Sequence, residues 1–325
     1  MSAVISRAAL AGPLVAAVAL AGALLATSEA GVPLRDPGGV SLRRFLIALG
    51  LAAALLAIDV IVRRRTWTRK SLLTVLAAIV SFHITYFAYR NVKSVIPLLA
   101  PGELYDRRLG DLERSVFGSD PAELLHSLLG TGASAHVLSA IYLLFFAFVP
   151  LALTGALVFS RKLESGLFFA TALALNWVLA AVSYRLLPAL GPIYADPGAF
   201  TELPATGVSR LQGTLLEQRT EFLADPNAAG GFQSIGAFAS LHTSLFVTAG
   251  IGAHLLGYPK LVCAAIWTGL AGTVLATVYF GWHYLVDDLA GVLIAVLSLG
   301  LARALTGLHP RVARQPVPVP STSPA

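Results

Sequence analysis

The distribution of apolar residues constrains this chain more than any other feature of its sequence. A membrane-spanning helix needs about 20 mostly apolar residues, and eight stretches meet this requirement: residues 8–26, 45–62, 71–89, 134–159, 166–187, 235–256, 261–280 and 282–302. Charged residues make up 12% of the chain and the mean hydropathy is +0.76, whereas a soluble domain carries about 25% charged residues. The sequence therefore predicts an all-α, polytopic membrane helical bundle with about eight spanning helices.

The charges between these stretches predict how the bundle is oriented. Basic residues dominate the segments on one side, as in Arg63-Arg64-Arg65, while the segments on the other side mix acidic and basic residues. Because an excess of Lys and Arg in short loops marks the cytoplasmic side, we expect both termini to be cytoplasmic. Arg43 and Arg44 locally contradict this pattern. The same placement accounts for the net charge of +6, so we expect no nucleic-acid partner.

The order of the stretches suggests three regions. Residues 1–133 are expected to form accessory spans and, within the outer loop 90–133, two amphipathic helices on the membrane surface. Residues 134–305 should form a catalytic helical bundle, and the Pro-rich residues 306–325 a disordered cytoplasmic tail. Residues 1–30 could also be a cleaved signal peptide, but their apolar run exceeds the usual 7–15 residues, so we favour a retained anchor.

Three ionisable residues at the outer ends of the last spans are the strongest functional candidates, because ionisable groups at membrane depth are costly. His242 lies near the outer end of the sixth stretch, and His283 and Asp287 lie at the outer start of the eighth. One descent and one return across the bilayer separate the histidines, which should therefore meet. Residues four apart share a helix face, so we expect the Asp287 carboxylate within about 2.6–3.2 Å of the His283 ring.

The start of the helix that carries His242 has two interpretations. It could begin near Ile235, or near Ser240, which would then be its N-cap. We favour the second, because Gly230, Gly231 and Gly236 indicate a loop up to that point. Free backbone N–H groups at a helix start attract phosphate.

Two segments of this half resemble known motifs. Ser240-Leu241-His242, and the segment from His283 to Asp287, resemble the last two signatures of the type 2 phosphatidic acid phosphatase superfamily. The residues of the two segments are more similar to those of the inositol phosphorylceramide synthase branch. The resemblance implies that His283 is the nucleophile and that Asp287 orients it. It also implies that His242 protonates the leaving oxygen and that Ser240 contacts the phosphate.

The chain departs from the superfamily pattern at its cations. The Ser-Arg of the third signature would fall at Ala276 and Thr277, and the first signature has no literal match. Phosphoryl transfer still needs positive charge around the phosphate oxygens. Arg185, at the outer end of the fifth stretch, is the first candidate, and Arg90 and Lys93, at the outer end of the third, are second choices.

These residues predict a lipid phosphoryl-transfer enzyme that works through a phosphohistidine, without a metal or other cofactor. We expect an integral protein of the plasma membrane with an extracytoplasmic site. The partners would be membrane lipids, a lipid phosphate or phosphodiester donor, and an alcohol as acceptor. With water as acceptor the protein would instead be a lipid phosphatase. A transporter or flippase would show inverted repeats and paired broken helices, and the sequence shows neither.

Overall fold

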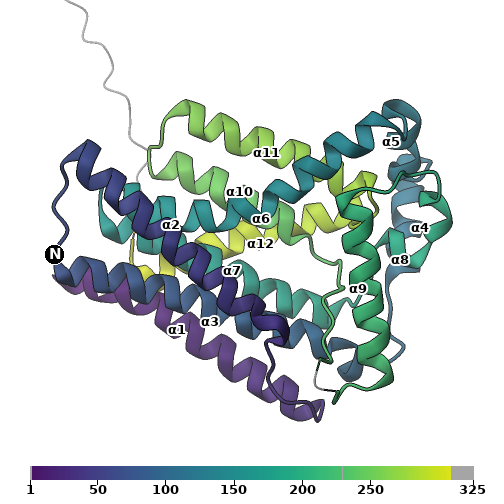
Figure 1. The fold of residues 1–325 in the computed structure, drawn as a ribbon, viewed down its shortest axis with the longest axis horizontal. Helices are drawn as coiled ribbons and strands as arrows, with labels where there is room; N and C mark the ends of the chain where they lie inside the picture. The colour runs from purple at the N-terminus through teal and green to yellow at the C-terminus, as the bar shows by residue number, and fades with distance from the viewer. Residues whose placement is uncertain (1, 229, 309–325) are drawn as a thin grey trace, which may run out of the picture.

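The structure, a computed structural model, describes residues 2–228 and 230–308, so nearly all of the predicted tail lies outside the described residues. Helices and loops account for the described chain (Figure 1). The helices are α1 (Ser2–Glu29), η1 (Pro37–Gly39), α2 (Val40–Arg63), α3 (Arg69–Leu99), α4 (Asp106–Phe117), α5 (Pro121–Leu129), α6 (Ala133–Phe159), α7 (Leu163–Leu186), α8 (Pro192–Ala195), η2 (Pro197–Phe200), α9 (Gly207–Ala224), α10 (Leu241–Leu255), α11 (Lys260–Tyr279) and α12 (Leu285–Thr306).

The predicted all-α membrane fold is confirmed, with a correction to the number of spans. Within the described residues, seven helices are long and apolar enough to cross a membrane: α1, α2, α3, α6, α7, α11 and α12. The sixth predicted stretch, residues 235–256, is shortened to α10, which has 15 residues. It is shorter because residues 235–240 are not helical and Ser240 caps the helix, its side chain accepting from the Thr243 N–H.

The two ends of the described chain lie at the same end of the bundle (Figure 1). There, the Arg7 guanidinium donates to the Ala304 carbonyl at 3.1 Å. α1 packs along α3 and α7.

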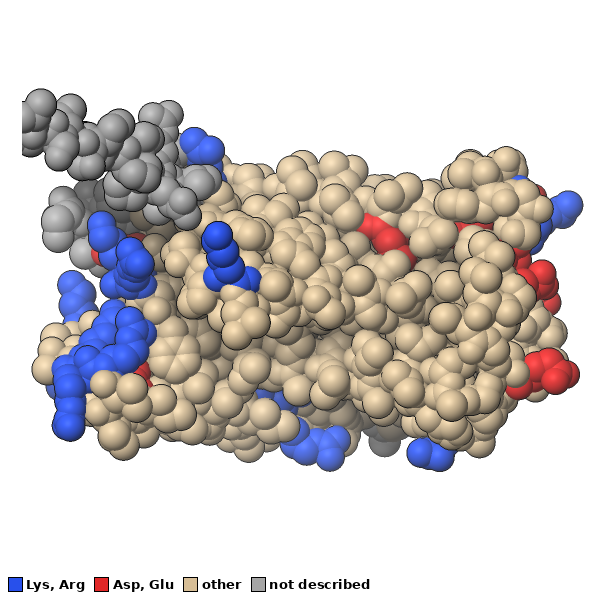
Figure 2. Space-filling model, turned by 90° about the horizontal axis from the view of Figure 1, so that it is seen from above, with Lys and Arg blue, Asp and Glu red and all other residues tan. Residues whose placement is uncertain are grey.

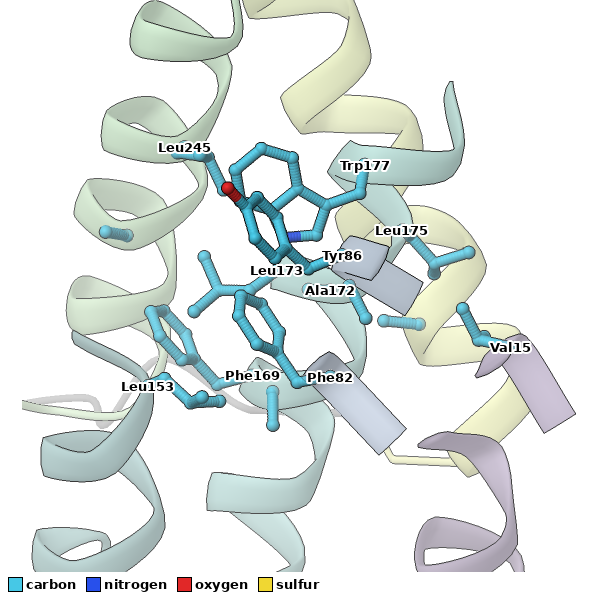
Figure 3. Close-up of a cluster of buried hydrophobic side chains, with 14 of the residues drawn as sticks. Val15, Phe82, Tyr86, Leu153, Phe169, Ala172, Leu173, Leu175, Trp177 and Leu245 are labelled. Carbon is cyan, nitrogen blue, oxygen red and sulfur yellow. The ribbon is translucent and has the colours of Figure 1, made fainter. Parts of the chain in front are cut away.

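α7 is the centre of the bundle. It is the most buried of the candidate spans, and α3, α12, α1 and α6 pack around it. Figure 3 shows Phe82 and Tyr86 of α3 beside Trp177 of α7. Their rings meet edge to face, with centroids 6.2 Å (Phe82–Trp177) and 5.1 Å (Tyr86–Trp177) apart. In a membrane, where burial against lipid gives little driving force, such close packing holds helices together.

Charge separates the two ends of the bundle. Figure 2 shows mainly Lys and Arg at one end, whereas Asp and Glu, mixed with some Lys and Arg, mark the other, acidic end. The acidic end carries α4, α5, α8 and α9, to the right in Figure 1. The Asp120 carboxylate accepts from the Ala122 N–H and caps the start of α5.

The two helices that carry the candidate catalytic residues approach closely. The Ser240 N–H, just before α10, donates to the Asp287 carbonyl in the first turn of α12 at 2.9 Å. This approach requires glycine at position 291, because a Cβ there would lie 2.5 Å from the Ser240 carbonyl oxygen. Replacing Gly291 by any other residue would push α10 and α12 apart.

Candidate active site

His242, His283 and Asp287 form one hydrogen-bonded chain. The Nδ1 atom of His242 lies 3.0 Å from Nε2 of His283. On the other side of the His283 ring, Nδ1 lies 3.3 Å from an Asp287 carboxylate oxygen, marginally longer than the expected range. The same oxygen accepts from the Tyr284 N–H at 3.0 Å. The structure thus brings together the three residues that the sequence singled out.

The carboxylate determines where the protons of this chain lie. In its ionised form Asp287 can only accept hydrogen bonds, and it then holds the proton of a neutral His283 on Nδ1 and leaves the lone pair on Nε2. That lone pair then accepts from Nδ1–H of His242. Burial lowers the pKa of His283 to about 4, and the Lys93 ammonium acts in the same direction. His283 is therefore neutral near pH 7, the form in which its nitrogen is a nucleophile.

Aromatic rings hold His242 in place. The ring of Phe145 lies 4.4 Å from that of His242, and the ring of Tyr142 lies 5.1 Å from it, measured between centroids. Tyr142 in turn stacks on Trp282, the residue before His283, with the ring planes 4° apart. These contacts from α6 fix the imidazole against rotation and keep its Nδ1 directed at His283.

A cavity of about 580 Å³ opens onto the two histidines, within the size range of small-molecule pockets. Its wall combines aromatic rings with four cationic side chains, those of Arg43, Arg44, Arg90 and Lys93. Trp177 and Trp282 also line it, and their buried indole N–H groups find no acceptor within the described chain. A ligand rich in oxygen would supply the missing acceptors and balance the positive charge.

The cations of the cavity differ in how their charge is compensated. Arg90 forms an ion pair of 2.6 Å with Asp36, which offsets its charge. The Lys93 ammonium lies 4.5 Å from the centre of the Tyr184 ring and, within the described ranges 2–228 and 230–308, has no carboxylate within ion-pair distance. Lys93 is therefore an uncompensated positive charge beside the histidine pair.

Two of the predicted phosphate-binding residues lie elsewhere. Arg185 is exposed and is not part of the cavity wall. Successive helical residues point about 100° apart, so its neighbour Tyr184 faces the cavity and Arg185 faces outward. Ser240 is fully buried, and its hydroxyl accepts from the Thr243 N–H as the cap of α10. Of the predicted cations, Arg90 and Lys93 line the cavity.

Arg43 and Arg44 were missed as site residues, although the sequence contained a signal for them. They contradict the charge pattern of the other segments because they lie at the start of α2, at the end of the bundle that carries the histidines. The guanidinium of Arg44 lies 5.0 Å from the centre of the Tyr86 ring and 5.4 Å from that of Phe146. Cation–π contacts of this kind hold Arg44 at the cavity wall.

A comparison with models of known protein families identifies the family of this chain. The model of the PAP2 superfamily matches residues 107–301, more than half of the chain. The chain belongs to the PAP2 superfamily. Members of this superfamily are generally phosphatases or phosphotransferases that act on lipid-like substrates. No curated protein and no solved structure matches the chain significantly.

The matched region does not contain the cations of the cavity. All four cationic residues of the wall precede residue 107 and come from α2 and α3. In this PAP2 protein the histidines therefore belong to the matched part, while the positive charge around them comes from helices that precede it. The boundary at residue 133 between accessory and catalytic parts stays a prediction, and the family match itself begins in α4.

α4, the first helix of the matched region, forms hydrogen bonds with the loops beside the candidate catalytic residues. The Asp106 carboxylate accepts from the N–H groups of Leu190 and Gly191 and from the Tyr284 hydroxyl. The Glu113 carboxylate accepts from the Leu285 N–H at the start of α12. The amphipathic helix expected on the membrane surface thus has a second, buried face that carries two acids. Both acids contact the two residues that follow His283, Asp106 through the Tyr284 hydroxyl and Glu113 through the Leu285 N–H.

Glu113 should make the stability of the protein depend on pH. Burial raises the pKa of Glu113 to about 7, so the folded state retains a proton that the unfolded state loses above pH about 4.5. Stability therefore falls as the pH rises from about 4.5 to 7. We expect Glu113→Gln, which keeps the accepting oxygen without the charge, to raise the apparent unfolding temperature more at pH 8 than at pH 5. The exposed Glu123→Gln on α5 is the control, and an equal gain at both pH values would contradict this account.

The segment before α10 is also pinned to the bundle. The Gln233 side chain donates to the Lys93 carbonyl at 2.7 Å, and the Ala239 N–H donates to the Ser183 hydroxyl at 3.0 Å. These contacts tie residues 233–239 to α3 and α7. They set the relative positions of Lys93 and His242, which would otherwise depend on a loop.

Proposed function

We propose that this protein transfers a phosphoryl group between lipid and acceptor through a phosphohistidine on His283, and that its acceptor is an alcohol, as in a lipid head-group phosphotransferase. The observation that carries the proposal is the chain His242–His283–Asp287 at the wall of a cavity that also holds an uncompensated cation. A nucleophile, a proton donor and a positive charge for the phosphate oxygens are the parts that such a reaction requires.

In the first step, Nε2 of His283 attacks the phosphorus of the donor. The bond from phosphorus to the leaving oxygen breaks and its electron pair stays with that oxygen. His242, which acts as the imidazolium, supplies the proton and becomes the neutral imidazole. Asp287 stabilises the imidazole as it becomes positively charged. Because the two histidine nitrogens lie 3.0 Å apart, the donor phosphate must displace this hydrogen bond in order to reach Nε2.

In the second step, the oxygen of an acceptor hydroxyl attacks the phosphohistidine and gives its proton to His242. The phosphorus–nitrogen bond breaks and its electron pair returns to Nε2, which restores both histidines. The size of the cavity and its unpaired indole donors support an acceptor with several oxygens. Water as acceptor would make the protein a lipid phosphatase, which is the second candidate and is supported by the same superfamily membership.

The proposal includes an extracytoplasmic site in the plasma membrane. One observation supports this side: the segments at the end opposite the histidines are mainly basic, as in Arg63-Arg64-Arg65, and an excess of positive charge marks the cytoplasmic side. A cysteine-accessibility measurement on intact cells tests it, with single cysteines placed at Glu123 and at Arg69. We expect an impermeant reagent to label the first position only.

The reaction itself is tested with purified protein and labelled lipid phosphates and phosphodiesters, with and without inositol or other polyols. The proposal expects the labelled phosphoryl group to appear as a phosphate ester of the added alcohol, and therefore to depend on which alcohol is added. Release of free phosphate at the same rate with every alcohol would instead establish the phosphatase. No turnover of any donor would contradict both.

The pH dependence of the reaction should reflect the lowered pKa of His283. Protonation of His283 removes its lone pair, so the rate falls as the pH drops through this pKa. Burial lowers the pKa of His283 to about 4. We therefore expect kcat/KM to fall on the acid side at a pH clearly below the ordinary histidine pKa of about 6.5. A phosphodiester donor is used because it does not titrate in this range. An acid limb at or above 6.5 would show that His283 is not held neutral by its surroundings.

A further inference from the structure

A second, smaller cavity continues from the active-site cavity into the bundle. It measures about 70 Å³ and lies between α2, α3, α6 and α7. Five residues line both cavities: Arg44, Tyr86, Phe145, Phe146 and Trp177. The two cavities are therefore neighbours that share one wall, with the guanidinium of Arg44 at their junction. We call the smaller one the apolar slot.

The apolar slot runs away from the histidines, toward the middle of the helices. On α3, Phe82 lies four residues before Tyr86, and on α6, Val149 lies four residues after Phe145. α3 and α6 run in opposite directions, so both steps lead the same way, by about 6 Å along the helix axis. Ile47, three residues after Arg44 on α2, follows the same direction. The slot thus extends from the active-site cavity toward the middle of the membrane-spanning helices.

The slot is open toward the surrounding lipid. Ile47 is 61% exposed, and α2, which forms one side of the slot, is the least buried of the candidate spans. Beyond Arg44 and His83 its wall is apolar or aromatic. His83 is itself bonded, through Nδ1, to the Ile79 carbonyl at 2.8 Å. The lining side chains change from cationic to apolar across Arg44. This order complements a lipid, whose anionic phosphate is followed by a hydrocarbon chain.

From this continuity we propose that the apolar slot holds a hydrocarbon chain of the lipid donor, with Arg44 contacting the donor near its phosphate. The inference rests on the proposed function and adds the place and orientation of the lipid. A chain that moves from the bilayer into the slot gains little hydrophobic free energy, because both surroundings are apolar. The slot therefore acts by positioning: with the chain held, the phosphorus is directed at Nε2 of His283.

Filling the slot tests this proposal. Val149→Trp on α6 should lower kcat/KM for a phosphatidate with sixteen-carbon chains by about tenfold or more, because small misplacements of a reacting group are costly. It should change kcat/KM for a water-soluble phosphatidate with four-carbon chains by less than about threefold, because so short a chain does not need the slot. The control is Leu144→Trp on the same helix, a residue that is 66% exposed and outside both cavities. It should leave both donors unaffected.

The two donors separate failure of this proposal from failure of the proposed function. If Val149→Trp lowers kcat/KM equally for both donors, or for neither, the slot does not hold the chain, although the enzyme acts on lipid phosphates. If the wild-type protein turns over neither donor nor any phosphodiester, the proposed function itself is wrong.

A second measurement uses only the wild-type protein, so its result does not depend on whether a variant folds. A phosphatidate with a photoreactive diazirine at mid-chain is illuminated with the wild-type protein, which is then digested and mapped. We expect label on the segments 44–50 of α2, 79–86 of α3 and 145–150 of α6. Label spread over the exposed faces of α1, α11 and α12 would overturn the proposal.

Discussion

The His283→Ala protein is expected to show no turnover above background, a loss of at least about 10⁴-fold, because residues that form one nucleophilic unit cannot substitute for one another. The loss should be the same for every donor, since no other described side chain presents a lone pair at the position of Nε2. His254→Ala is the matched control. His254 lies at the far end of α10, is exposed, and hydrogen-bonds Trp267 rather than any cavity residue.

The partner histidine should behave differently with different donors. His242→Ala removes a general acid, which typically contributes about 10²–10⁴-fold. A nitrophenyl phosphate ester needs no proton on its leaving oxygen, so this donor should recover most of the lost rate in His242→Ala and none in His283→Ala. Equal losses for both donors in His242→Ala would mean that His242 has another role.

Removing the uncompensated charge of Lys93 should also lower activity strongly. We expect Lys93→Met to lower kcat/KM by about 10²–10³-fold, the usual effect of losing one group that stabilises transition-state charge. The same substitution should not destabilise the protein, because an unpaired buried charge costs free energy in the absence of ligand. Activity and thermal stability, measured on the same preparation, should therefore change in opposite directions or stability should stay constant.

Arg185→Ala is the control for the Lys93→Met variant. Arg185 is also basic and was the first candidate from the sequence, but it is exposed and outside the cavity, so we expect activity within about twofold of wild type. A large loss in Arg185→Ala with little loss in Lys93→Met would show that the cavity seen here is not where the phosphate binds.

The contrast between Arg185 and Lys93 shows what the sequence could predict and what it could not. Spacing and hydropathy placed His242, His283 and Asp287 together, because these depend on helix period and on the number of crossings. The direction of one side chain at a helix end depends on a rotation of about 100° per residue. The sequence could not resolve that rotation at the end of α7, where Tyr184 and not Arg185 lines the cavity.

α4 gives a second example. Its apolar residues Leu112 and Val116 are exposed, as expected of a surface helix. Asp106 and Glu113, together with Leu109, form the buried face instead. The spacing of three and four residues along this face was visible in the sequence. The sequence could not show that this face is buried, because the acids are buried only where the N–H groups of distant loops pair with them.

The start of α10 was anticipated by local chemistry, and the length of this span was not. Ser240 as N-cap follows from the preference of serine for that position, and the preceding glycines indicated a loop. The segment before it is held by hydrogen bonds to Lys93 of α3 and Ser183 of α7, which lie far from it in the sequence. Such tertiary contacts decide how much of an apolar stretch becomes helix.

The central claim is that His283 carries the phosphoryl group, and trapping the intermediate tests it most directly. Purified protein is mixed with a phosphorus-labelled donor, quenched in alkali to preserve phosphohistidine, digested and mapped by mass spectrometry. The account predicts acid-labile label on the peptide that contains His283, more of it in Asp287→Asn if the second step is slowed more than the first, and none in His283→Ala. Label on any other residue, or label that persists in His283→Ala, would contradict it.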